Sequence, residues 1–236
     1  MNNNEFRKGV IHPVECFKEG WELIKNEYWM FFAISLVGAL IGGISMYILL
    51  GAMMCGMYYC FLQKIDGNPV SIDGLWKGFG VIAPSLIVTV FIVVPMFVLM
   101  GIIYAPLIMA AAMGSKLSAD ELTQLFFGAF AVDVVIAVIM TCFHTLLLFS
   151  FHLIIDRKLG GIQAMLTSAK AVWQNLSGVA GLLGVAILLS IPAMLTCGIG
   201  VYFLLPIMLA GYTVAYRKMF PAISGNFNPP PPNAYL

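Results

Sequence analysis

The stretch that decides the fold is FGVIAPSLIVTVFIVVPMFVLMGIIYAPLIMAAAM, from Phe79 to Met113, which has no charged side chain in 35 residues. Three other stretches are almost as apolar, and Asp133 is the only charged residue in the four: Trp29 to Gln63, Leu125 to Ile155 and Leu176 to Tyr216. The whole chain is 61% hydrophobic and 10% charged, whereas soluble domains are about 45–50% apolar and about 25% charged. This composition predicts an all-α membrane protein whose main partner is the lipid bilayer.

These four stretches, called runs below, are too long for one straight membrane crossing each. A helix of about 35 residues extends about 52 Å, against a hydrocarbon core of about 30 Å. Folding each run in half gives two helices of about 16 to 20 residues, near the minimum for crossing. Glycines that would permit the turns lie near the middle of three runs, at Gly42 and Gly43, at Gly101, and at Gly198 and Gly200. The third run lacks such a residue and is either a hairpin or one tilted span, so we expect a bundle of six to eight transmembrane helices.

The positions of the basic residues support this hairpin arrangement. All twelve Lys and Arg residues lie outside the runs. If every run is a hairpin, they share one face of the membrane, which is cytoplasmic by the positive-inside rule. The polar first 28 residues do not resemble a cleavable signal, so we expect a multi-pass protein of the bacterial plasma (inner) membrane with both termini cytoplasmic. The net charge of +1 argues against a nucleic-acid partner.

Amphipathic segments precede the runs, with apolar residues spaced three or four apart. The two longest stripes are Val14, Phe17, Trp21, Ile24 and Tyr28, and Ile162, Met165, Ala169, Val172 and Leu176. Shorter versions are the stripe of Ile72, Leu75, Trp76 and Phe79, and a helix begun by a capping box at Ser118 and Glu121. Such helices lie in the membrane interface with the apolar side toward lipid. We expect three tryptophans to anchor them at headgroup depth: Trp21, Trp76 and Trp173.

A single membrane domain is expected over residues 1–225, followed by a Pro-rich disordered tail over residues 226–236. The second and fourth runs share one order of residues. In each, a proline is followed by Gly-Ile, an aromatic residue and a second proline, and these prolines are Pro95 and Pro106, and Pro192 and Pro206. The order suggests an internal repeat of residues 1–117 and 118–225. The alternative is that turn and kink residues recur wherever hairpins occur.

The carboxy-terminal third carries a family resemblance. The stretches DRKLGGIQAMLTSAKAVWQNLSG from Asp156 and TCGIGVYFLLPIMLAGYTVAYR from Thr196 resemble a group of uncharacterised bacterial integral membrane proteins. That group is related to the membrane domain attached to some glycerophosphodiester phosphodiesterases. The shared residues are Asp156, Gly160 or Gly161, Ala164, Ser168, Trp173, Gly198, Ile199, Gly200, Pro206 and Tyr216. The resemblance implies a multi-pass helical plasma-membrane protein, and it implies no activity.

Few residues are candidates for chemistry. Asp133 is an ionisable residue inside a run, where such groups often mark an ion or proton path. His152 would pair with Asp133 across a hairpin, whereas His144 is expected near the outer turn. Asp133 near the membrane boundary, contacting headgroups, is the simpler alternative.

Other residues point to packing rather than chemistry. Gly38 and Gly42 form a G-x-x-x-G pair that serves either intramolecular packing or dimerisation. The cysteines are expected to be mainly small buried residues, and Cys142 and Cys197 at outer turns are either two thiols or a disulfide. The prolines Pro95, Pro106, Pro192 and Pro206 are expected to kink helices.

No catalytic, nucleotide-binding or metal-binding motif occurs in the chain, and no cofactor is expected. The sequence therefore favours a non-enzymatic membrane scaffold or partner subunit, acting in envelope homeostasis and bound to another protein or to copies of itself. The alternative is a small transporter or channel for a lipid-like or apolar solute, with the four prolines beside a cavity. A third reading is a membrane-embedded enzyme that uses Asp133 and the histidines.

Overall fold

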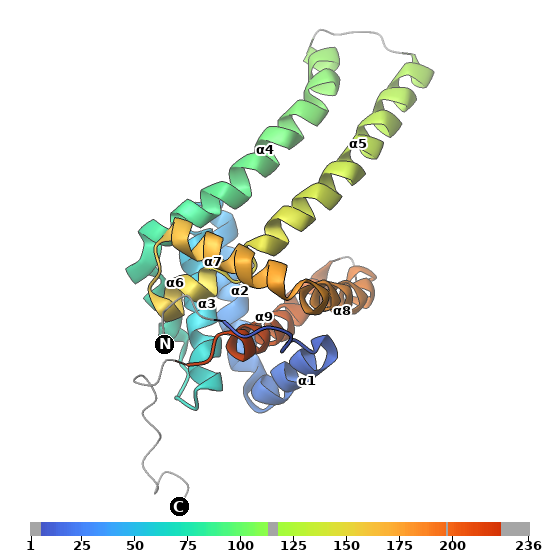
Figure 1. Ribbon diagram of the computed structural model, residues 1–236. Helices are drawn as coiled ribbons and strands as arrows, with labels where there is room; N and C mark the ends of the chain where they lie inside the picture. Colours follow the sequence, from blue (N-terminus) through green and yellow to red (C-terminus); the bar gives the residue numbers. More distant parts are fainter. Residues whose placement is uncertain (1–5, 113–117, 197, 223–236) are drawn as a thin grey trace, which may run out of the picture. The chain divides into compact units, whose positions relative to one another are not determined.

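The computed structural model describes residues 6–112, 118–196 and 198–222, and these residues form helices and connecting turns (Figure 1). The helices, of which η1 and η2 are 3₁₀ helices, are α1 Pro13–Ile24, η1 Lys25–Glu27, α2 Tyr28–Ile44, α3 Leu50–Ile65, η2 Ile72–Val81, α4 Ile82–Ala112, α5 Ala119–Leu146, α6 Ser150–Arg157, α7 Gly161–Gln174, α8 Leu176–Met194 and α9 Ile199–Met219. The predicted all-α class is therefore confirmed for the described part of the chain.

Five helical segments of the described chain are long and apolar enough to cross a membrane: Pro13–Ile44, Ile72–Pro106, Thr123–Arg157, Leu176–Met194 and Ile199–Met219. The helix α3 has 16 residues and is shorter than these segments. The chain divides into two compact units. Unit 1 contains the described residues of Met1–Thr89 and Leu146–Leu236, and unit 2 is Val90–Thr145.

In the first and fourth runs, a helix ends near the predicted glycines. Between α2 and α3, Met46 and Tyr47 have left-handed backbones with φ of 50° and 68°. Their N–H groups donate to the carbonyls of Gly43 and Gly42 at 3.0 and 3.1 Å, which closes the turn. Gly198, with φ of 83°, precedes α9 and permits the turn after α8. Cys197 lies outside the described residues, so the choice between two thiols and a disulfide with the exposed Cys142 stays open.

The second run does not form the predicted hairpin. The helix α4 is continuous for 31 residues, and Gly101 lies inside it between Pro95 and Pro106. A helical glycine costs only about 1 kcal/mol relative to alanine, whereas an open turn in lipid leaves backbone groups unsatisfied. The third run is one helix, α5, as far as Leu146, and a short turn separates it from α6. The corresponding glycines of the second and fourth runs thus differ in structure, and the internal repeat stays a prediction.

Unit 1 is built around α3, which contacts α2, η2, α6 and α9. Ten of its residues are buried, among them Gly56, which lies against the backbone of Leu75 in η2. Gly38 and Gly42 of α2 face Met57 and Leu50 of α3, so this G-x-x-x-G pair packs within the chain. Such contacts bring helix backbones close together, as small residues do between membrane helices.

The amino-terminal segment is held by helices from the end of the chain. Along α1, which lies beside α9 in Figure 1, Gly20 approaches the backbone of Gly211. The N–H of Gly9 donates to Asn175 Oδ1 at 2.7 Å, and the N–H of Arg7 donates to the carbonyl of Met219 at 2.9 Å. Asn175 lies between α7 and α8, so one amide fixes the start of the chain to that junction.

The predicted apolar stripes of the amphipathic helices are only partly exposed. In α7, Met165 and Val172 of the predicted lipid stripe are buried in the protein. The exposed apolar residues are Ile162, which belongs to the predicted stripe, and Leu166 and Trp173, which do not; the three share one helical side. The reason lies in the small residues beside the predicted stripe, such as Ala164, Ser168 and Ala171, which allow the backbone to approach its neighbours. In α1, Phe17 and Ile24 are likewise buried, while Val14 and Trp21 are exposed.

The close approach of η2 to α3 generates a stability prediction. An added Cβ at Gly78 would overlap the carbonyl oxygen of Ala52, whereas Gly80, two residues along η2, faces open space. We expect Gly78→Ala to lower the free energy of unfolding by about 1–3 kcal/mol, the usual cost of overpacking, and Gly80→Ala to change it little. Thermal unfolding of the purified protein in detergent measures both. Equal melting temperatures for the two variants would contradict the packing.

Candidate functional site

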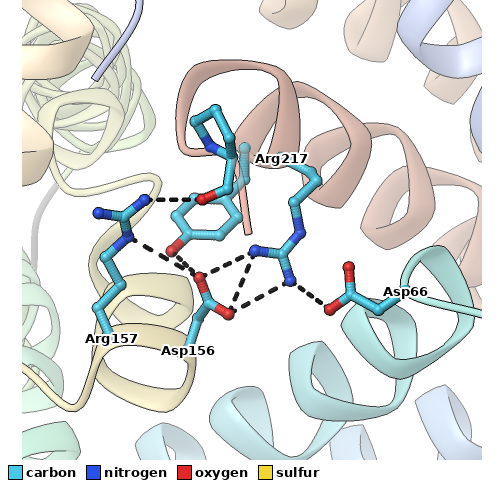
Figure 2. A network of polar contacts seen from close by, with 6 residues as sticks. Asp66, Asp156, Arg157 and Arg217 are labelled. Carbon is cyan, nitrogen blue, oxygen red and sulfur yellow. Dashed lines mark hydrogen bonds and ion pairs between the residues drawn. The ribbon is translucent and has the colours of Figure 1, made fainter. Parts of the chain in front are cut away.

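Three helix ends meet at the guanidinium group of Arg217, near the end of α9. Its Nη2 donates to Asp66 Oδ2, just after α3, at 2.7 Å. Its Nη1 donates to Asp156 Oδ2 of α6 at 3.1 Å, and both terminal nitrogens lie 3.3 Å from Asp156 Oδ1. Figure 2 shows Arg217 between the two aspartates. A planar guanidinium with five donors suits this geometry, which fastens the three ends together.

The carboxylate of Asp156 makes polar contacts with three residues of this cluster. Besides the contacts with Arg217, its Oδ2 accepts the hydroxyl of Tyr216 at 2.7 Å. The Nε of Arg157 lies 4.0 Å from the same oxygen, and Nη2 of Arg157 donates to the carbonyl of Pro221 at 3.0 Å (Figure 2). The guanidinium of Arg157 also lies over the ring of Phe220, 5.2 Å from its centroid. The side chain of Asp156 is 18% exposed, so its charge is largely removed from water and compensated by these donors.

A cavity of about 150 Å³ opens beside this cluster. Its polar wall contains charged and amide groups, and its floor is apolar. The lining residues are Tyr59, Leu62, Gln63, Asp66, Asn68, Ile155, Asp156, Lys158, Arg217 and Ala222. Lys158 has a left-handed backbone with φ of 55°, which ends α6 there. The cavity thus lies where apolar helices end and charged residues begin.

The environment of the Asp66 carboxyl disfavours its charged form. Burial raises the pKa of the Asp66 carboxyl above its ordinary value, the positive charge of Arg217 opposes this, and Asp156 raises the pKa further. The folded protein therefore disfavours the charged form of Asp66. By linkage, the stability that this group contributes is present below its ordinary pKa and is lost as the pH rises through the raised pKa.

A second polar cluster surrounds His152 in the core of unit 1. Its side chain is completely buried, and its ring stacks on Tyr58 and Tyr216 with centroid distances of 3.6 and 4.8 Å. His152 Nε2 lies 3.3 Å from Thr213 Oγ1, and that hydroxyl donates to the carbonyl of Leu209. Through the ring of Tyr216, this cluster adjoins Asp156.

The other predicted residues are spread over the chain. Asp133 is a half-exposed residue of α5 in unit 2, and its pairing with His152 of unit 1 stays a prediction. Also in α5, His144 Nε2 lies 3.3 Å from the carbonyl of Ile92. The four prolines lie inside helices: Pro95 and Pro106 in α4, Pro192 in α8 and Pro206 in α9. The predicted anchors Trp21, Trp76 and Trp173 are exposed, and Trp173 is 70% exposed.

Unit 2 contains a cavity of its own, of about 660 Å³. Both α4 and α5 line it, with Pro106 on one wall and Gly128 on the other. Most lining residues are apolar, and Glu121 and Gln124 are the polar ones. Glu121 also completes the predicted capping box, because its Oε2 accepts the N–H of Ser118 at 2.8 Å and Ser118 Oγ accepts the N–H of Glu121 at 3.3 Å. These hydrogen bonds from Ser118 lower the pKa of Glu121.

The sequence carried one overlooked signal for the Arg217 cluster. Asp66, Asp156 and Arg217 each lie within three residues of the end of an apolar run. Runs that end on the same side of a membrane bring such residues to one depth, and opposite charges there attract. Periodicity alone could not show that the three ends touch. Within the described chain, no group of three or more His, Cys, Asp and Glu side chains is placed to hold a metal ion.

Comparison with protein-family models, with curated proteins and with solved structures found no match for this chain. The relation to the membrane domain of glycerophosphodiester phosphodiesterases therefore stays a resemblance.

The two aspartates of the cluster should respond differently to neutralisation. Asp156→Asn removes the main charge that compensates Arg217, and we expect a loss of about 1.5–3 kcal/mol in the free energy of unfolding, typical of hydrogen bonds to charged groups. Asp66→Asn removes a charge that burial disfavours, so we expect little loss at pH 7. Lowering the pH should make wild type resemble Asp66→Asn, because wild-type Asp66 then gains a proton. Thermal unfolding at pH 7 and pH 4 measures this, and an equal loss at pH 7 for both variants would contradict it.

Proposed function

We propose that the protein is a non-enzymatic, multi-pass protein of the bacterial plasma membrane that serves as a scaffold or partner subunit in envelope homeostasis. The observation that supports this most is the surface of unit 2. Val134 and Val135, whose side chains point about 100° apart around α5, are both exposed, and so are Ile102 and Met109 of α4. A helix that is apolar on all sides needs lipid or another protein around it.

The packing of unit 2 also favours a partner. Among the described residues, α4 and α5 have little close backbone contact with each other, unlike the helices of unit 1. Lipid does not drive apolar helices together, so membrane helices associate through close packing and polar contacts. Two long helices with so little packing of their own offer extended surfaces to a protein partner or to a second copy of this chain.

The proposed topology has six crossings, by α2, α3, α4, α5, α8 and α9, with both termini cytoplasmic. Eleven of the twelve basic residues, all except Lys116, then lie on the cytoplasmic side, as the positive-inside rule favours. The 31 residues of α4 extend about 46 Å and the 16 residues of α3 about 24 Å, so one helix exceeds and the other falls short of a core of about 30 Å. Tilting and local thinning of the bilayer accommodate such differences.

The topology is tested by labelling single-cysteine variants in intact cells. A cysteine in place of Lys116 should react with a membrane-impermeant reagent from outside, because α4 crosses the membrane once. A cysteine in place of Lys158 should react only after the cells are opened. Protection of both positions in intact cells would favour the all-hairpin arrangement instead and contradict six crossings.

A second candidate function is a transporter or channel for a lipid-like or apolar solute. The observation that favours it is the cavity of about 660 Å³ in unit 2, which is mainly apolar and lies beside Pro106. Transporters place substrate sites beside interrupted membrane helices, and Glu121 and Gln124 would contact a polar end of the solute.

Two neighbouring positions of α5 distinguish these functions. Val135 is 60% exposed, and Ile136 lines the cavity. We expect a photo-crosslinking residue at 135 to form a discrete adduct with a protein in living cells. A residue at 136 is the matched control, which should form that adduct less. Lipid-sized adducts from position 136, together with no protein adduct from position 135, would contradict the partner-subunit proposal and favour the second candidate.

A further inference from the structure

The cavity beside Arg217 contains binding groups that the fold itself leaves unused. Arg217 donates hydrogen bonds to two aspartates, and Asp156 accepts hydrogen bonds from Arg217 and Tyr216. Asp66 gives only Oδ2 to Arg217, and in Figure 2 no dashed line reaches its second oxygen. Lys158 lines the same cavity and forms no ion pair with a carboxylate of the described chain. One carboxylate oxygen and one ammonium group therefore remain for a ligand.

The two remaining charges have opposite signs, which restricts the class of ligand. A purely anionic ligand would be attracted by Lys158 but repelled by Asp66 and Asp156. A purely cationic ligand would be attracted by the aspartates but repelled by Lys158 and Arg217. A molecule that carries a positive and a negative charge close together can pair with both Asp66 and Lys158. The side-chain amides of Gln63 and Asn68 supply neutral donors and acceptors in the same cavity.

The position and size of the cavity restrict the ligand further. Leu62 and Ile155, each 3% exposed, form an apolar floor just before the ends of α3 and α6. The polar lining residues come next in the chain after these apolar residues. This order from apolar to polar resembles a lipid layer, in which acyl chains are followed by headgroups. A volume of about 150 Å³ holds several water molecules or one small polar group, and it is too small for a long acyl chain.

From these features, we propose that the cavity binds a small zwitterion in which an ammonium and a phosphate are joined by a short linker. Asp66 Oδ1 accepts hydrogen bonds from the ammonium, and Lys158 pairs with the phosphate. Two sources supply this chemistry: the headgroup of an ethanolamine phospholipid in the cytoplasmic leaflet, and the free water-soluble headgroup. The proposal goes beyond the partner-subunit function and does not depend on it, because the site lies wholly within unit 1.

The test uses the full chain purified in a neutral detergent. Native mass spectrometry with equal amounts of phosphatidylethanolamine and phosphatidylglycerol should show one ethanolamine lipid retained in preference. Lys158→Gln should weaken this retention roughly tenfold, the effect of losing one charge-assisted contact, without touching the contacts of Arg217. Asp66→Asn should weaken it similarly, because it keeps the shape of the wall and removes the charge. Lys170→Gln, an exposed lysine of α7 outside the cavity, is the control and should leave retention unchanged.

Calorimetry with free phosphoethanolamine separates the two sources. Binding of the free compound that Lys158→Gln weakens identifies a water-soluble ligand, whereas retention of the lipid without binding of the free compound identifies a headgroup. Either result supports the site. Equal retention of the two lipids with no binding of phosphoethanolamine overturns the proposal. So does a Lys158→Gln variant that behaves like Lys170→Gln, with melting temperatures serving to show that both variants are folded.

Discussion

Close approach of helix backbones at small residues is the constraint on which unit 1 depends. In a bilayer, an apolar side chain gains little by moving from lipid to protein, so burial alone cannot choose the partners of a helix. Gly56 and Gly78 bring α3 and η2 together, and Gly20 does the same for α1 and α9. These contacts explain why α3, with 16 residues, is more completely buried than the longer and more hydrophobic α4.

The Arg217 cluster fixes how the packed helices of unit 1 are aligned along their axes. Small residues let helices slide along one another, whereas an arginine between two aspartates fixes the relative heights of three helix ends. The hydroxyl of Tyr216 joins the cluster to the stacked rings around His152, so the polar end of unit 1 and its aromatic core form one continuous set of contacts. A site that binds headgroups at this place would be rigid before a ligand arrives, which reduces the entropy lost on binding.

Composition was enough to predict the helical class, the glycines marked where α2 and α8 end, and the Ser-x-x-Glu motif predicted the capping box at Ser118. They were not enough to predict the course of the second run, because Gly101 is compatible with both a turn and a helix, and the choice depends on neighbours distant in sequence. Periodicity found the amphipathic segments α1 and α7 but assigned their apolar stripes to lipid. A residue such as Val172 is equally at home against lipid or protein, and only the small residues beside it, Ala164 and Ser168, indicate which. The cluster of Asp66, Asp156 and Arg217 was missed for another reason: Arg217 is 151 residues from Asp66 and 61 residues from Asp156 in the chain, and a pattern of neighbouring residues cannot show that they meet.

The anchoring of Gly9 by Asn175 has a consequence for biosynthesis. The two residues are 166 positions apart, and Arg7 is tied to Met219, still nearer the end of the chain. A ribosome adds about 5–20 residues each second, so the first segment waits on the order of ten seconds or more for the groups that hold it. During that interval the apolar face of α1 must be shielded by the insertion machinery or by lipid, and α1 can dock only after α9 has been synthesised.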